Sequence, residues 1–112
     1  MHELSLSQSI GQIVRKHAAG RTVQVVHLQV GQLRQVVPDS LVYCWGLVNE
    51  GTECEGSVLD IDHVPAAIRC DECSSTTVLD EMRMACASCG SSNVQVTAGE
   101  ELLVTSIELA EV

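Results

Sequence analysis

The chain is poor in aromatic residues: its 112 residues include no phenylalanine, one tryptophan (Trp45) and one tyrosine (Tyr43). The core must therefore be built from valine, leucine, isoleucine and alanine, and a small core of this kind is often supplemented by a metal staple. Basic residues are also scarce, with 6 Lys and Arg against 15 Asp and Glu, which gives a formal charge of −9. That charge repels phosphate backbones and anionic lipid, so we expect neither a nucleic-acid-binding nor a membrane-surface protein.

Long apolar runs are missing as well. No stretch approaches the roughly 20 apolar residues of a membrane span. The opening Met1-His2-Glu3 segment begins neither the basic region nor the apolar stretch of a signal peptide. We therefore expect a cytoplasmic protein, where paired cysteines serve as metal ligands more readily than as disulfides.

Four of the six cysteines form two C-x-x-C pairs, Cys70 with Cys73 and Cys86 with Cys89. Two such pairs can complete a tetrahedral site of four thiolates, which suits zinc. Every position of that site is filled by sulfur, so we expect a structural ion with no open position to activate water. A disulfide framework or a reactive redox pair is the alternative interpretation.

Apolar periodicity predicts two helices and three strands around the cysteine module. The helices are expected over residues 4–19 and from Pro38 to about residue 50. The strands are expected at 23–30, which we predict to be central and covered on both faces, at 57–63, and at 101–109 with Leu103, Ile107 and Leu109 on one face. The predicted class is α+β: a small three-stranded sheet packed by two helices, with an inserted four-cysteine zinc-ribbon module before the last strand.

The first three residues form a second candidate metal site. The α-amine of Met1, the amide nitrogen of His2 and the His2 imidazole can close adjacent chelate rings on one ion, and Glu3 can add a carboxylate or its own amide nitrogen. A nitrogen-rich, nearly planar set of this kind favours Ni(II) or Cu(II) over Zn(II). Taken alone the motif is weak, because a frayed terminus with a solvated histidine explains it equally simply.

Several segments together resemble one known family. They are the opening Met-His-Glu-Leu-Ser-Leu, Val30-Gly-Gln-Leu, Pro38-Asp-Ser-Leu41, and Glu55-Gly-Ser-Val-Leu-Asp-Ile61 before the cysteine pairs. This pattern is similar to the HypA/HybF family of nickel metallochaperones, which act in NiFe-hydrogenase maturation, and the resemblance covers essentially the whole chain.

The resemblance implies nickel binding at Met1, His2 and Glu3, and zinc binding at the four paired cysteines. It also implies docking to a nickel-binding GTPase maturation factor and nickel transfer to the hydrogenase large subunit, while a homodimer stays open. The corresponding units are a nickel-binding α/β domain of residues 1–66 plus 95–112 and a zinc-binding module of residues 67–94. One position departs from the family pattern: Val37 stands where many relatives carry an acid, and the nearest acid is Asp39.

The remaining cysteines and histidines have simpler interpretations. Cys44 falls on the apolar stripe of the second helix and is expected to pack in the core, whereas Cys54 is expected to be exposed in a polar loop. His17 and His27 are interpreted as structural, and His63 lies at the boundary of the cysteine module.

Enzymatic function has little support, because the sequence carries no nucleophile triad, phosphate-binding glycine loop or metalloprotease helix. An acidic zinc-ribbon interaction module without nickel transfer and a thiol oxidoreductase are the other functional classes that the residues allow.

Overall fold

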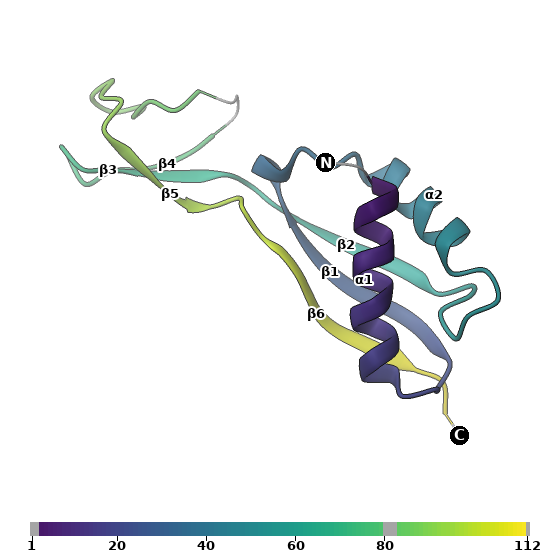
Figure 1. Cartoon of the computed structure of the whole chain (residues 1–112). Helices are drawn as coiled ribbons and strands as arrows, with labels where there is room; N and C mark the ends of the chain where they lie inside the picture. Colours follow the sequence, from purple (N-terminus) through teal and green to yellow (C-terminus); the bar gives the residue numbers. More distant parts are fainter. Residues whose placement is uncertain (1–2, 80–82, 112) are drawn as a thin grey trace.

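The computed structural model describes residues 3–79 and 83–111. Figure 1 shows an elongated molecule with a larger α/β lobe and a smaller β lobe, and its principal extents are 55 × 24 × 16 Å. The larger lobe contains two helices, the 3₁₀ turn η1 and three strands, with bounds α1 Glu3–Ala18, β1 Val23–Gly31, η1 Gln32–Arg34, α2 Pro38–Val48, β2 Val58–Val64 and β6 Leu102–Leu109. None of the helices within the described ranges is long and apolar enough to cross a membrane.

The three strands of the larger lobe form one sheet in the order β2-β1-β6. Strand β2 runs parallel to β1, which requires the crossover that α2 provides, and β6 runs antiparallel to β1. Both helices cover the same face of this sheet (Figure 1). The predicted α+β class, with two helices on a three-stranded sheet, is confirmed.

The core of this lobe follows the helical periodicity of the sequence. On α1 the side chains of Leu6, Ile10 and Val14 are buried, because residues four apart share one face of a helix. On α2 the buried residues are Leu41 and Trp45, again four apart. The Trp45 indole also donates a hydrogen bond of 2.9 Å to the hydroxyl of Ser57, which satisfies its only polar atom.

Two predictions about the sheet are wrong. Strand β1 is central but covered on one face only: Val26, Leu28 and Val30 are buried, while the intervening side chains are exposed or half-buried. Leu103 does not share the core face of Ile107 and is 55% exposed. A register shift between β1 and β6 lies between Leu103 and Ile107. Such an irregularity turns the side chains on its two sides to opposite faces of the sheet.

The smaller lobe is inserted between β2 and β6, as the sequence predicts. Its strands are β3 Ala67–Cys70, β4 Thr76–Val78 and β5 Val94–Ala98. They form a second antiparallel sheet in the order β4-β3-β5. A small separate core of Ala66, Ile68 and Leu79 lies beneath it. The strands are short, so most of the order in this lobe must come from the cysteine cluster described below.

The 3₁₀ turn η1 joins the two lobes. The Leu33 amide donates a hydrogen bond to the Gly99 carbonyl at 2.8 Å, and the Leu33 side chain packs against the small core of the β lobe. The Gln32 side-chain carbonyl accepts a hydrogen bond from the Ala66 amide at 2.9 Å. Arg34 donates to the Glu100 carbonyl at 2.8 Å. These three bonds hold η1 against both connections that lead into and out of the β lobe.

Candidate metal centre

The four paired cysteines converge at the tip of the β lobe. Their sulfur atoms all lie within 4.8 Å of one another. The Sγ atoms of Cys70 and Cys89 are 3.6 Å apart, and those of Cys73 and Cys86 are 3.5 Å apart. A tetrahedral zinc ion with Zn–S bonds of about 2.3 Å requires sulfur atoms about 3.8 Å apart. The cluster therefore has the donor type, number and spacing that a structural zinc requires.

The two C-x-x-C segments adopt the same local conformation. In the first, the Ser74 amide donates to the Cys70 carbonyl at 3.0 Å and the Cys70 amide to the Ser75 carbonyl at 2.9 Å. In the second, the Gly90 amide donates to the Cys86 carbonyl and the Cys86 amide to the Ser91 carbonyl, both at 2.9 Å. Ser74 and Gly90, which follow each pair, both have positive φ values, 63° and 75°.

These turns also aim backbone amides at sulfur. The Glu72 amide lies 3.4 Å from the Cys70 Sγ. Amide hydrogen bonds to a thiolate stabilise the charged form and support a metal-bound sulfur. Two matching turns that face each other thus form the paired knuckles of a zinc ribbon.

The sulfur atoms strongly influence one another's ionisation. Hydrogen bonds from the hydroxyl and amide of Ser75 lower the pKa of the Cys73 thiol to about 6. The Ser91 amide favours the thiolate of Cys89, but the neighbouring sulfur of Cys70, local desolvation and the sulfurs of Cys73 and Cys86 outweigh it and raise the pKa of Cys89 to about 12. The pKa of the Cys86 thiol is also lowered, by hydrogen bonds from the backbone of Cys89 and Ser88, so the thiols of the cluster differ in how readily they lose a proton. A bound dication favours the thiolate form of all four, which is the form that zinc requires.

The two unpaired cysteines lie apart from this cluster. Cys44, on α2, is only half-buried, and the buried core residues of this helix are Leu41 and Trp45, so the predicted core position of Cys44 is not confirmed. The prediction for Cys54 is wrong: its side chain is buried rather than exposed, and burial raises the pKa of its thiol. The loop around Cys54 folds back over Trp45 through Ser57, and this non-local closure is invisible in the polar sequence of the loop.

The proposed nickel segment falls largely outside the described residues. Met1 and His2 are not described, and Glu3 is the first residue of α1, where its carboxylate lies in the first turn. Figure 1 shows that α1 and α2 both begin at the end of the sheet from which the β lobe extends. At this end Val37 precedes α2 and Asp39 lies in its first turn, both exposed.

His63 lies near the same end of the sheet as Val37 and Asp39. It is exposed and lies near the carboxyl end of β2, one residue before the strand ends at Val64. The structure places it among none of the groups of potential metal ligands found within the described residues. The structure therefore adds no role for His63 to the position that the sequence indicated, at the boundary of the two lobes.

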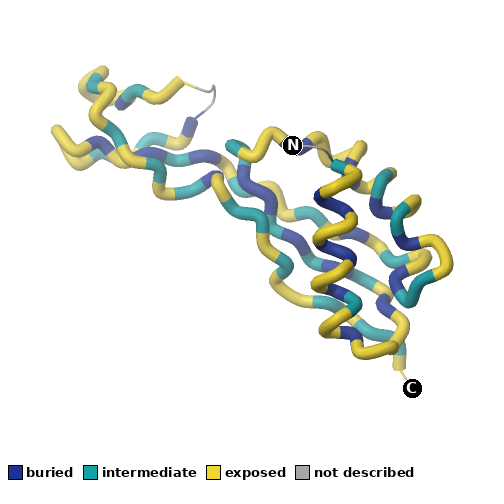
Figure 2. Tube along the Cα trace, viewed as in Figure 1, coloured by how far each residue is buried: buried dark blue, intermediate teal, exposed yellow. Residues whose placement is uncertain are grey.

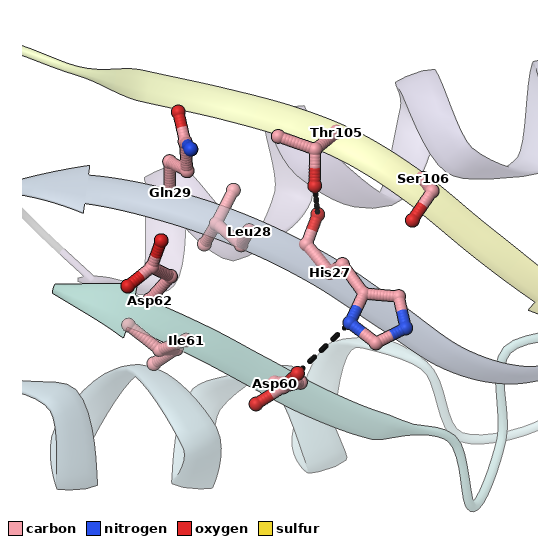
Figure 3. A pocket seen from close by; sticks show the side chains of 8 residues that line it. All are labelled: His27, Leu28, Gln29, Asp60, Ile61, Asp62, Thr105 and Ser106. Carbon is pink, nitrogen blue, oxygen red and sulfur yellow. Dashed lines mark hydrogen bonds and ion pairs between the residues drawn. The ribbon is translucent and has the colours of Figure 1, made fainter.

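The uncovered face of the larger sheet carries a polar groove of about 520 Å³ (Figure 3). His27 bridges all three strands here: its Nδ1 lies 2.8 Å from the Asp60 carboxylate on β2, and its Nε2 lies 2.6 Å from the Glu108 carboxylate on β6. These two bonds raise the pKa of His27, the Glu108 bond most. Both ring nitrogens are engaged with different carboxylates, so the imidazole ties strands together, as the structural interpretation predicts.

Fold and site together define a class: a small two-lobed α+β protein with a four-cysteine zinc-ribbon insertion. Comparison with known proteins identifies the family. A family profile described as hydrogenase/urease nickel incorporation, metallochaperone, HypA, matches residues 1–109. The chain therefore belongs to the HypA family of nickel metallochaperones, and the predicted resemblance is confirmed.

Individual relatives agree with this assignment. The chain is 37% identical over 112 residues to hydrogenase maturation factor HypA from a Nostoc species, covering 100% of this chain and 98% of the relative. It is 39% identical over 113 residues to the HypA of Rhizobium leguminosarum, covering 97% and 99%. The solution structure of the Ni metallochaperone HypA from Helicobacter pylori shares the fold, with a TM-score of 0.68, 24% identity and coverage of 97% of both chains.

Proposed function

We propose that this chain carries Ni(II) at Met1, His2 and Glu3 and delivers it for NiFe-hydrogenase maturation. The observation that carries the proposal is the family match over residues 1–109, which includes this opening segment. The chemistry supports the same residues, because an amine, an imidazole and deprotonated amides form a ligand set suited to nickel. In this account nickel is cargo and the protein performs no catalysis.

Zinc has a different role in this proposal. Cys70, Cys73, Cys86 and Cys89 hold a structural zinc in the module of residues 67–94, while residues 1–66 with 95–112 form the nickel-binding unit. The four sulfur atoms fill a tetrahedral shell, so the zinc stays enclosed. The nickel ligands lie on a chain end and can exchange their ion, which is what transfer requires.

The proposed partners follow from the family's work in hydrogenase maturation. We infer that a nickel-binding GTPase maturation factor docks with this chain and that the hydrogenase large subunit is the final acceptor, all in the cytoplasm. Nucleic acid and membranes are not among the expected partners, since a formal charge of −9 opposes both. Homodimer formation is a separate question, which the self-association measurement below addresses.

The test is metal stoichiometry on protein with its native, untagged N-terminus. Elemental analysis after nickel loading should give one zinc and one nickel per chain. Replacing Val37 by Ala should leave the nickel content unchanged, because a valine at this position supplies no donor. Protein that holds one zinc and no nickel would instead select an acidic zinc-ribbon interaction module.

A further inference from the structure

Helix α2 has an unusual surface for a protein with a formal net charge of −9. From Ser40 to Asn49 it carries no charged residue. Only Leu41 and Trp45 of the helix are buried. A helix that is apolar on every side is normally covered on every side, whereas here one side faces solvent. Figure 2 shows buried and exposed positions alternating along this helix.

The exposed side of α2 forms two adjacent rows. Tyr43 and Leu47 make one row, with side chains 69% and 47% exposed, and Val42 and Gly46 make the other. Residues four apart lie next to each other on a helix, so these four positions are continuous. We call these four residues, together with Val58, the α2 patch.

A groove of about 320 Å³ runs along the patch, between α2 and the segment that leads into β2. Val42 and Gly46 line it on one side and Val58, itself 59% exposed, on the other. Nothing lies within 4 Å of the position where a Cβ on Gly46 would stand. A glycine here costs helix stability of about 1 kcal/mol relative to alanine, and it leaves room for another surface to approach the backbone.

The charges around the patch indicate what covers it. Three exposed acidic residues flank the patch: Asp39 and Glu50 at the two ends of α2, and Glu55 between Cys54 and Gly56, which line the groove. Glu53 is paired with Arg15, and Asp60 with His27 on the uncovered face of the sheet, so neither belongs to the rim. Between Arg34 and Arg69 the sequence contains no Lys or Arg. Asp39 lies one turn before Tyr43, and Glu50 follows Gly46 by four residues. The patch thus has an apolar centre with an acidic rim, and a complementary surface has an apolar centre with a basic rim. A second copy of this chain would meet the rim with the same negative charge.

We propose that the α2 patch is the docking surface for a protein partner that presents apolar side chains surrounded by Lys and Arg. Tyr43 anchors the contact, because a large amphipathic side chain in a desolvated centre is the commonest source of binding energy at interfaces. Helix α2 begins at the same end of the sheet as α1, whose first residue Glu3 is one of the proposed nickel ligands, so a partner seated on the patch lies along a helix that starts at this end (Figure 1).

The test measures binding to the nickel-binding GTPase maturation factor of the same organism, and the choice of this probe rests on the proposed function. Full-length protein carrying Tyr43→Ser and Leu47→Ser should bind it at least tenfold more weakly in calorimetry. The matched control changes two equally exposed apolar residues elsewhere, Ile13→Ser and Val78→Ser, and should stay within twofold of the parent. Equal losses in both double variants, or no loss in the first, would overturn the proposal.

Two further variants separate docking from folding and from charge. Gly46→Gln fills the groove while improving helix propensity, so it should weaken binding tenfold and yet raise the melting temperature. Glu50→Lys should weaken binding, whereas the same reversal at exposed Glu111 should not. Sedimentation tests the other occupant. If the parent dimerises through the patch and Gly46→Gln is monomeric, a second copy of this chain occupies the patch, and the proposal of a partner with a basic rim is overturned.

Nickel titrations on the same proteins keep the two proposals apart. All patch variants should bind nickel as the parent does. A parent that docks with the GTPase through the patch but binds no nickel at its N-terminus would defeat the proposed function and leave the patch intact. A parent that binds nickel but not the GTPase would defeat the proposal for the α2 patch and leave the proposed nickel site intact.

Discussion

Gly31 and Gly99 meet backbone to backbone at the junction of the two lobes, where a Cβ added to Gly31 would overlap the Gly99 carbonyl group. Gly31 ends β1, and Gly99 lies between β5 and β6 with a positive φ of 108°. The same Gly99 carbonyl accepts the 2.8 Å hydrogen bond from Leu33 that fixes η1. The geometry of the junction therefore depends on both residues lacking a side chain.

Gly31→Ala should destabilise the protein by about 1–3 kcal/mol, as overpacking against fixed backbone does. The matched control is Gly46→Ala, in the middle of α2, where a Cβ meets open space. That change should stabilise the protein by up to about 1 kcal/mol through helix propensity. Urea denaturation of both variants measures the two effects, and equal free energies of unfolding would contradict the tight junction.

The His27 bridge predicts a pH-dependent contribution to stability. Hydrogen bonds to Glu108 and Asp60 raise the pKa of His27 above its ordinary value of 6.5. A histidine whose pKa is raised by folding stabilises the folded state fully below its unfolded pKa, and this contribution is lost as pH rises through the folded pKa.

His27→Gln should therefore lower the melting temperature more at pH 6 than at pH 9. The control is His17→Gln, because the His17 ring bonds to the backbone carbonyl of Ile13, at 2.9 Å, and among the described residues it forms no ion pair with a carboxylate. Its effect should differ less between the two pH values. A His27→Gln effect that grows toward pH 9 would show that the bridge does not favour the imidazolium.

Cys73→Ala should remove zinc and disorder the β lobe while the larger lobe stays folded. Structural zinc supplies on the order of 10 kcal/mol of apparent binding energy at neutral pH, and this lobe has only a small core of its own. Elemental analysis and amide NMR spectra check both parts. Cys44→Ala should keep the full zinc content, because Cys44 lies outside the cluster. Full zinc retention in Cys73→Ala would rule out the four-sulfur site.

Nickel affinity should fall by more than tenfold between about pH 7.5 and pH 6. Two proposed donors compete with protons in this window, with reference pKa values of about 6.5 for imidazole and about 7.7–8.0 for the α-amine. Deprotonated amide nitrogens steepen the dependence, whereas zinc enclosed by four thiolates stays bound. Nickel titrations across this range provide the measurement, and a flat profile would indicate a site built on carboxylates such as Asp39.

The sequence predicted those features that repeat at a regular spacing or combine in one local motif. The i, i+4 spacing of Leu41 and Trp45 predicted α2, and the paired cysteines predicted the ribbon. Features that depend on contacts between distant segments were missed. The three strands of the β lobe are too short to show a period, and η1 is defined by its contact with Gly99.

Exposure was the other property that the sequence did not predict. Cys54 is buried because its loop closes over Trp45, and Leu103 is exposed because the register shifts along β6. Neither cause leaves a local signal in the chain. The same limit applies to the α2 patch: its composition is visible in the sequence, but its exposure appears only once the helix is placed on the sheet.

The most direct test of the nickel-carrier account is a calorimetric nickel titration of the protein with its native N-terminus, compared with His2→Ala. His2→Ala removes the imidazole and should abolish high-affinity nickel binding, while elemental analysis still finds one zinc per chain. His17→Ala serves as the control and should bind nickel as the parent does. If His2→Ala binds nickel as tightly as the parent, the N-terminal segment is not the nickel site and the account is contradicted.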